Sequence, residues 1–250
     1  MPWSVRQELL PDLKFFSSQD IPSDFFRTFV WWPWDKLLRR QFITSHQLRF
    51  QEIRTTNDLF FVCAFMLMAN RISVLNETLI SHTINRSESL SATRAESHRC
   101  AVEALVALKA FICQQGMMEH RLRDYKNYVV VFLEWHLNTI SGPAFHPFYQ
   151  QVKEFVVALD AKSDDFYDEF IAAAHHRITT LSAEEYLFSL KDRVLKELEF
   201  FQARSSALQQ EVETLTHSLA GQKDENAILH NQLHEIEERV TALLNKSNFC

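Results

Sequence analysis

The feature that most constrains this chain is a seven-residue repeat of apolar residues over its last third. Across residues 187–243, apolar side chains recur at alternating steps of three and four. Strict spacing of seven over this length is the condition for a left-handed coiled coil, and a continuous helix would be roughly 85 Å long. Because such a stripe cannot bury itself, we expect a partner helix, either from another copy or from the chain folding back.

We call this apolar stripe the seam, and it occupies the a and d positions of the heptads. We expect these residues to mediate oligomerisation: Leu198, Phe201, Leu208, Val212, Leu215, Leu219, Asn226, Leu229, Leu233, Ile236, Val240 and Leu243. A buried Asn226 facing its symmetry mate would fix the register and favour a parallel dimer. We therefore predict a homo-oligomer, with a dimer favoured.

Two polar core positions, Gln222 and Asn226, follow Gly221 and allow an alternative. A break over residues 219–225 would let residues 226–244 fold back on residues 193–219. We prefer the continuous helix, since one glycine in a helix interior costs only ~1 kcal/mol. The residues that flank the seam pair charges poorly, so partner choice is not strongly encoded by salt bridges.

The rest of the chain also favours helices, because only three glycines and six prolines are present among 250 residues. Tight β-turns and phosphate-binding loops need more glycine than this. We predict an all-α fold, with a helical bundle domain at residues 1–180 and a coiled-coil oligomerisation segment at residues 181–250. Ser182 and Glu185 form a capping box that opens the last helix. The expected helices before it span residues 24–32, 34–54, 58–83, 91–115, 117–140, 146–161 and 164–179.

Charge and cysteine usage narrow the class of protein. The formal net charge of −6 disfavours a surface that binds nucleic acid throughout, although it leaves a nucleic-acid partner open. The N-terminus lacks the pattern of a signal peptide, and the apolar run at residues 59–69 is too short for a transmembrane segment. We expect a cytoplasmic protein whose Cys63, Cys100 and Cys113 are buried free thiols, with Cys250 at the end of the chain.

No familiar catalytic or metal-binding motif stands out, so we expect no cofactor and no metal, and we favour a non-enzymatic protein. Trp31, Trp32 and Trp34 lie between Arg27 and Arg40. Aromatic residues beside basic ones can stack bases, contact a membrane interface or anchor a protein partner. Covering the core is the more common role of such clusters. Among the functional interpretations, we prefer a protein-binding hot spot.

The most distinctive charged residues are Arg99 and Glu103, which lie four apart on one helical face. With apolar residues interleaved, we expect them to be half-buried between two helices, together with Arg123 or Tyr125 from the second helix. Half-buried charges must be paired. We therefore prefer an ion-pair network that fixes helix register over a catalytic site.

The pattern Arg99-x-x-x-Glu103-Ala-Leu-x-x-Leu-Lys109, followed by Arg121-x-Arg123-Asp124-Tyr125, resembles a group of uncharacterised bacterial helical proteins. That group is similar in architecture to the HEPN superfamily, and the resemblance covers residues 58–140. HEPN ribonucleases use an Arg and a His with four to six residues between them, at a dimer interface. Arg39 or Arg40 with His46 has that spacing, outside the matching hairpin. The resemblance implies an RNA-targeting toxin or antiphage-defence component.

The function that the sequence favours is a helical interaction or scaffold protein within a multiprotein assembly. Its body would dock a protein partner, and its coiled coil would join copies. The HEPN-like activity is the first alternative, with Arg99, Glu103, Arg40 and His46 as weak catalytic candidates. A second alternative is a secreted bacterial effector that binds host proteins through the coiled coil.

Overall fold

A computed structural model of the chain describes residues 4–78, 80–81 and 94–247, and their side chains as far as residue 240. Within these residues the chain forms α-helices and short 3-10 helices, and its only β-type pairings are two isolated bridges, Val5–Phe29 and Phe16–Ile72. The prediction of an all-α fold is confirmed. The chain divides into two units, which we call the body, Met1–Phe188, and the rod, Ser189–Cys250.

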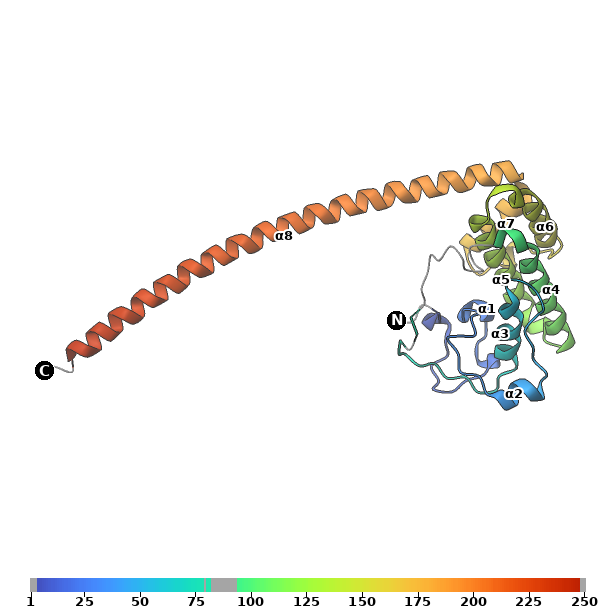
Figure 1. Cartoon of the computed structure of the whole chain (residues 1–250), viewed down its shortest axis with the longest axis horizontal. Helices are drawn as coiled ribbons and strands as arrows, with labels where there is room; N and C mark the ends of the chain where they lie inside the picture. The colour runs from blue at the N-terminus through green and yellow to red at the C-terminus, as the bar shows by residue number, and fades with distance from the viewer. Residues whose placement is uncertain (1–3, 79, 82–93, 248–250) are drawn as a thin grey trace. The chain divides into compact units, whose positions relative to one another are not determined.

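The body is a bundle arranged around one central helix. α5 (Met118–Thr139) contacts α1, α4, α6 and α7 (Figure 1). Because neighbours surround it, α5 is buried on all faces along residues 124–130. The α-helices of the body before α8 are α1 (Phe25–Thr28), α2 (Arg40–Ser45), α3 (Asn57–Met68), α4 (Arg99–Gln114), α5, α6 (Phe145–Val157) and α7 (Glu169–Thr180).

α4 and α5 form the short-linked helical hairpin that the sequence predicts. Gly116 lies between them with a φ of 67°, a conformation in which a side chain would be strained. The amide of Met117 donates to the carbonyl of Ile112 at 3.0 Å, which closes the end of α4. The helices predicted at residues 146–161 and 164–179 correspond to α6 and α7, and the latter begins at Glu169.

The N-terminal part is less helical than predicted. The helix expected at residues 24–32 is only α1, and the one expected at residues 34–54 is only α2. Backbone pairing is the reason in the first case: Val30 N–H donates to the carbonyl of Ser4, and Arg6 N–H donates to that of Thr28, both at 2.9 Å. In the second case, α2 ends at Ser45, and Gln47 then takes a left-handed conformation with a φ of 53°.

α3 ends earlier than residue 83, for a similar reason. After Met68 the chain becomes extended, and Ile72 exchanges two backbone hydrogen bonds with Phe16, of 2.6 and 3.0 Å. The predicted end at residue 83 and the predicted start of the next helix at residue 91 lie outside the described residues. No helix in the described part of the chain is long and apolar enough to cross a membrane.

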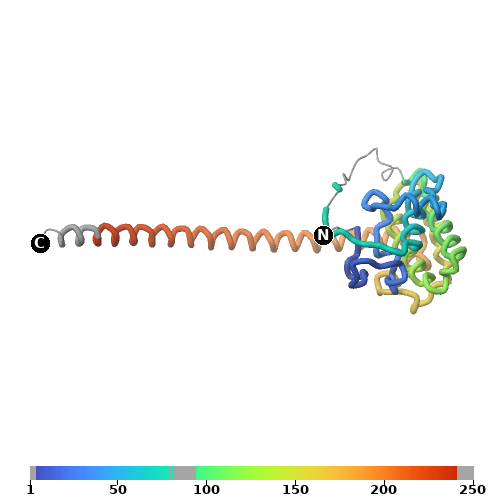
Figure 2. The backbone as a smooth tube through the Cα atoms, turned by 90° about the horizontal axis from the view of Figure 1, so that it is seen from below, coloured from blue at the N-terminus to red at the C-terminus, as the bar shows by residue number. Residues whose placement is uncertain are grey.

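The last helix, α8 (Ala183–Ser247), begins with the predicted capping box. Ser182 N–H donates to Glu185 Oε2 at 2.7 Å, and Glu185 N–H donates to Ser182 Oγ at 3.1 Å. Its first turns belong to the body, because Ala183 and Tyr186 are buried. α8 then continues through Gly221 without a break (Figure 2). The alternative in which the chain folds back near Gly221 is therefore wrong.

Candidate functional site

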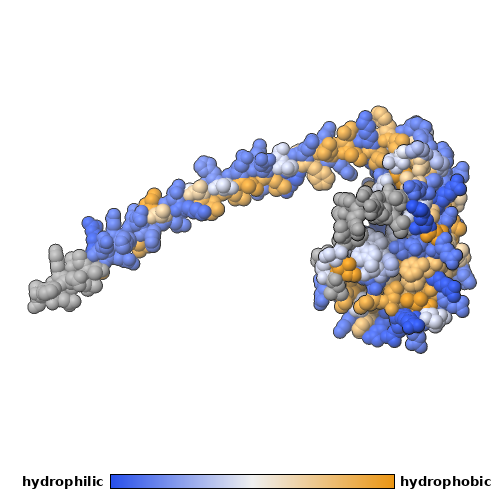
Figure 3. Space-filling model, in the orientation of Figure 1, coloured by the Kyte–Doolittle hydropathy of each residue, from blue (hydrophilic) through white to orange (hydrophobic). Residues whose placement is uncertain are grey.

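The seam of α8 is a long row of exposed apolar side chains. Ten of its apolar members, all predicted to mediate oligomerisation, are large side chains that are between 44% and 64% exposed in a single copy: Leu198, Phe201, Leu208, Val212, Leu215, Leu219, Leu229, Leu233, Ile236 and Val240. Apolar residues recur along the rod between hydrophilic ones (Figure 3). The side chain of the last predicted member, Leu243, lies outside the described residues.

The seam is regular because α8 is an uninterrupted helix. Residues three and four apart lie on the same face of a helix, so the a and d residues form one continuous stripe. Asn226 and Gln222 lie in this stripe on the same helix, with apolar residues on either side of them. A partner that buried the stripe would also bury these two amides, which would then need hydrogen-bond partners.

The start of the rod is apolar over a wider arc than the rest. Leu195 is 45% exposed and Phe200 is 66% exposed, although neither occupies an a or d position. Tyr186, at the start of α8, is buried in the body, and its hydroxyl donates to Asn138 Oδ1 at 2.9 Å.

The three predicted Trp residues have different environments. Trp31 packs edge-on against Phe132 of α5, with ring centroids 5.7 Å apart, and so contributes to the core. Trp32 and Trp34 stack on one another at 4.6 Å, and Trp34 is exposed. The core role therefore applies to Trp31, whereas the other two form a surface pair.

The charged pair of the hairpin is not the half-buried network that the sequence predicted. Arg99 and Glu103 are both exposed on α4, because α4 turns its apolar face towards α3 and α5. Tyr125 is fully buried, but its hydroxyl donates to the carbonyl of Leu105 at 2.9 Å. Arg123 donates to the carbonyls of Asp165 and Phe166.

The candidates from the HEPN resemblance lie on separate helices. Arg40 and His46 are both exposed, at the start of α2 and just after its end, whereas Arg99 and Glu103 lie on α4. His46 Nδ1 is 2.9 Å from the carbonyl of Phe42, and its ring stacks on that of Phe42. The RNA-targeting activity stays a prediction.

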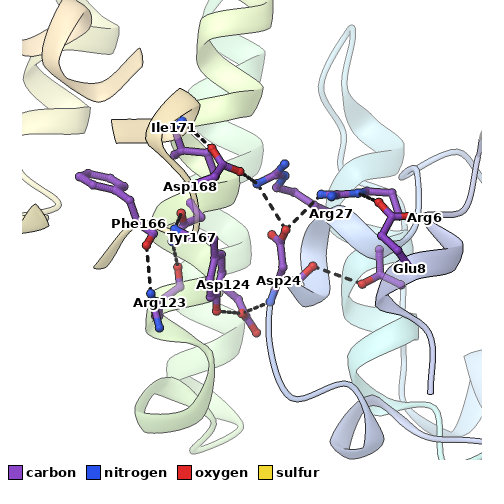
Figure 4. A network of polar contacts seen from close by, with 12 residues as sticks. Arg6, Glu8, Asp24, Arg27, Arg123, Asp124, Phe166, Tyr167, Asp168 and Ile171 are labelled. Atoms are coloured by element: carbon purple, nitrogen blue, oxygen red, sulfur yellow. Dashed lines mark hydrogen bonds and ion pairs between the residues drawn. The ribbon is translucent and has the colours of Figure 1, made fainter. Parts of the chain in front are cut away.

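A buried network of polar contacts does exist, but it involves other residues (Figure 4). Asp124 of α5 accepts hydrogen bonds from Asp24 N–H at 2.6 Å, from Arg121 Nη1 at 2.7 Å and from the hydroxyl of Tyr167. Arg121 also donates to the carbonyls of Ile21 and Ser18. The network thus ties the N-terminal segment to α5.

The same network reaches the segment before α7. Arg27 lies 3.3 Å from Asp24 Oδ2 and 3.5 Å from Asp168 Oδ2. Asp168 Oδ1 also accepts from Ile171 N–H at 2.8 Å, which caps α7. Figure 4 shows these groups between α5 and segments from both ends of the body. The role of this polar network is structural, since its carboxylates are bound to arginines, a tyrosine and backbone amides of the body itself.

Asp24 is the least satisfied member of this network. Its side chain is buried, and its Oδ1 accepts no hydrogen bond from the described residues. Burial raises the pKa of Asp24, although Arg27 and Arg6 beside its other oxygen lower it. Among the described residues, no group of His, Cys, Asp and Glu side chains is arranged to hold a metal ion.

The cysteines only partly match the prediction of buried thiols. Cys63 and Cys100 are buried and free, and burial raises the pKa of Cys63 to about 12, so this thiol stays protonated. Cys113 is exposed on α4, which contradicts the prediction, because it lies on the solvent face of that helix. Cys250 lies outside the described residues.

Comparisons with protein-family models, curated proteins and solved structures find no match to this chain. The site must therefore be interpreted from its own geometry. The clearest candidate for function in that geometry is the exposed seam of α8.

Proposed function

We propose that this chain is a scaffold protein that self-associates through α8 as a parallel, two-stranded coiled coil. The observation that carries the proposal is the exposure of the ten apolar seam residues in one copy. Each half-exposed side chain of this size would contribute ~1 kcal/mol when buried. Two copies would together gain ~20 kcal/mol, which exceeds the ~4–15 kcal/mol that association costs.

A parallel arrangement in register is favoured by the two polar layers. In that register Asn226 faces Asn226 of the second copy, and Gln222 faces Gln222. The side chain of an asparagine can donate and accept, so each polar layer satisfies itself. A paired asparagine at an a position favours two parallel strands, because a shifted register would place each amide against apolar residues.

The consequence of such a dimer is a protein that presents two copies of its body. Most aromatic side chains that pack on α5 belong to the core, whereas Trp34 and Trp135 are exposed. Exposed aromatic side chains are better suited to docking a protein partner than to catalysis. The proposed role is to join two bodies within a larger assembly.

The proposal is tested by measuring the mass of the full chain in solution. Light scattering after size exclusion should give twice 29.4 kDa at micromolar concentration. Leu208→Glu places a charge at a d position and should give a single-copy mass. Gln210→Glu adds the same side chain two residues away, on the opposite face of α8, and should remain dimeric.

A wild-type chain that stays at 29.4 kDa at all these concentrations would contradict the proposal. So would a Leu208→Glu chain that assembles as well as Gln210→Glu. Far-ultraviolet circular dichroism checks that the body of each variant is folded, because body helices supply much of the helical signal whether or not the rods associate.

A further inference from the structure

The segment of residues 36–51, which includes α2, is basic, although the chain as a whole is acidic. It holds Lys36, Arg39, Arg40 and Arg49 and no Asp or Glu. With a net charge of −6 for the whole chain, the remainder carries −10. Arg39, Arg40 and Arg49 are exposed, and none forms an ion pair with a carboxylate in the described part of the chain. Three guanidinium groups are thus free for an external anion.

An apolar side chain projects beside these arginines. Leu37 is 95% exposed, the highest exposure among the large apolar residues described. Its neighbours on both sides are held: Lys36 is largely buried, and Leu38 is half-buried against the core. Leu37 is therefore exposed because an ordered loop holds it in that position, and not because the segment is flexible.

The loop is fixed by the buried ammonium group of Lys36. Its Nζ donates to the carbonyl of Val30 at 2.6 Å, to that of Trp32 at 2.8 Å and to Asp35 Oδ1 at 2.6 Å. The amide of Lys36 also donates to the carbonyl of Pro33 at 3.3 Å. These bonds hold the stacked pair Trp32–Trp34 in the same turn that presents Leu37.

We propose that this loop, with Trp34, Leu37, Arg39 and Arg40, is a binding site for the surface of an anionic phospholipid membrane. A tryptophan suits the interface between headgroups and acyl chains. A leucine inserts below it, and arginines bind the phosphates. Because the loop is already ordered, binding costs little conformational entropy.

The leucine decides between a membrane and a nucleic acid. Arginines and tryptophans would also suit single-stranded RNA, where aromatic rings stack on bases. Leu37 offers neither stacking nor a hydrogen bond, so an RNA ligand would leave it exposed. The acyl-chain region of a bilayer, by contrast, gains free energy when it buries this side chain. This inference is independent of the proposed self-association.

The test uses the full chain and vesicles of two compositions. In co-sedimentation, the wild type should bind mixed phosphatidylcholine–phosphatidylglycerol vesicles more tightly than pure phosphatidylcholine, and added salt should weaken that binding. Leu37→Ser should weaken binding about tenfold. Arg39→Ala and Arg40→Ala should each weaken it about fivefold, and only for the anionic vesicles.

Matched control variants are available on α4. Val106 is 51% exposed and Arg99 is exposed, so Val106→Ser and Arg99→Ala remove the same kinds of group elsewhere on the body. Both should bind vesicles like the wild type. The inference is overturned if the wild type fails to bind the mixed vesicles, or if Leu37→Ser binds as tightly as Val106→Ser. It is also overturned if an RNA oligonucleotide binds more tightly than the vesicles and Leu37→Ser leaves that affinity unchanged.

Discussion

The backbone N–H of Asp24 donates a 2.6 Å hydrogen bond to Asp124 Oδ1, which joins two residues 100 positions apart in the sequence. Asp24 can direct its amide in this way because its backbone is left-handed, with a φ of 56°. Aspartate is one of the few residues that tolerate this conformation. The contact anchors the N-terminal segment of the body to its central helix.

Removal of the Asp124 carboxylate should destabilise the body strongly. In Asp124→Ala, the buried guanidinium of Arg121 loses its ion pair, and the hydroxyl of Tyr167 and the amide of Asp24 lose their acceptor. We expect a fall of ~3 kcal/mol in the free energy of unfolding, measured by urea titration at one fixed protein concentration. Glu103→Ala, at an exposed carboxylate, should change it by less than ~0.5 kcal/mol. Equal effects of the two substitutions would contradict the structural role of this network.

Acidification should destabilise the body through His136. The pKa of this histidine is lowered to about 4, mainly by burial and partly by the nearby Arg94, while the hydrogen bond to the carbonyl of Phe132 opposes the shift. Between pH 6.5 and pH 4 the unfolded chain binds a proton that the folded chain does not. The free energy of unfolding must therefore fall as the pH falls through this window, by ~3 kcal/mol in all.

The His136→Leu variant should lose this part of the pH dependence. Urea titrations from pH 7 to pH 4 would give a flatter profile than the wild type, since leucine cannot take up the proton. His120→Leu, at an exposed histidine, should keep the wild-type profile. A His136→Leu profile parallel to that of the wild type would show that this histidine does not control acid stability.

Substitution of Gly221 tests the continuity of α8. A Cβ atom at this position would meet no atom of the described residues within 4 Å, and the residue lies inside a helix. Gly221→Ala should therefore stabilise α8 by ~1 kcal/mol and raise the midpoint of its thermal unfolding. Gly116→Ala is the opposite case, because the φ of Gly116 is 67°, and it should destabilise by ~1 kcal/mol. A loss of stability in Gly221→Ala would instead indicate a turn in the rod.

The orientation of the two helices can be tested with a disulfide. In a parallel dimer, residue 240 of one copy faces residue 240 of the other. Val240→Cys, in a chain with Cys113→Ser and Cys250→Ser, should therefore cross-link to itself under mild oxidation. Glu238→Cys points outwards at an f position and should not cross-link. An antiparallel dimer that pairs Gln222 with Asn226 would instead cross-link Val240→Cys to Leu208→Cys.

Local signals explain why the sequence predicted several elements well. Gly116 marks the connection of the α4–α5 hairpin because only glycine is unstrained at that φ, and Ser182 with Glu185 marks the start of α8 because both side chains bind nearby amides. The regularity of the seam likewise depends only on residues three and four apart. The length of α8 followed from that spacing.

The N-terminal part was harder to predict, because distant contacts determine it. Val30 leaves the helical conformation to bond with Ser4, and Ile72 does so to bond with Phe16. Neither pairing has a signal in the local sequence. Apolar periodicity alone therefore predicted helices that were too long.

The burial and pairing of charged residues were also hard to predict from local sequence. Arg99 and Glu103 were recognised because they are four apart, yet both are exposed. The buried carboxylate of Asp124 has one local signal, Arg121 three residues before it on the same helix. Its partners Asp24 and Tyr167 come from distant segments that no spacing rule connects.

The enclosure of α5 on all sides also determines how its amide protons exchange with solvent. Its amides at residues 124–130 are hydrogen-bonded within the helix and shielded by α1, α4, α6 and α7. Deuterium can reach them only when these neighbours separate, so their exchange rates should follow global unfolding. The protons of this one segment thus report the stability of the whole body at equilibrium, without denaturant.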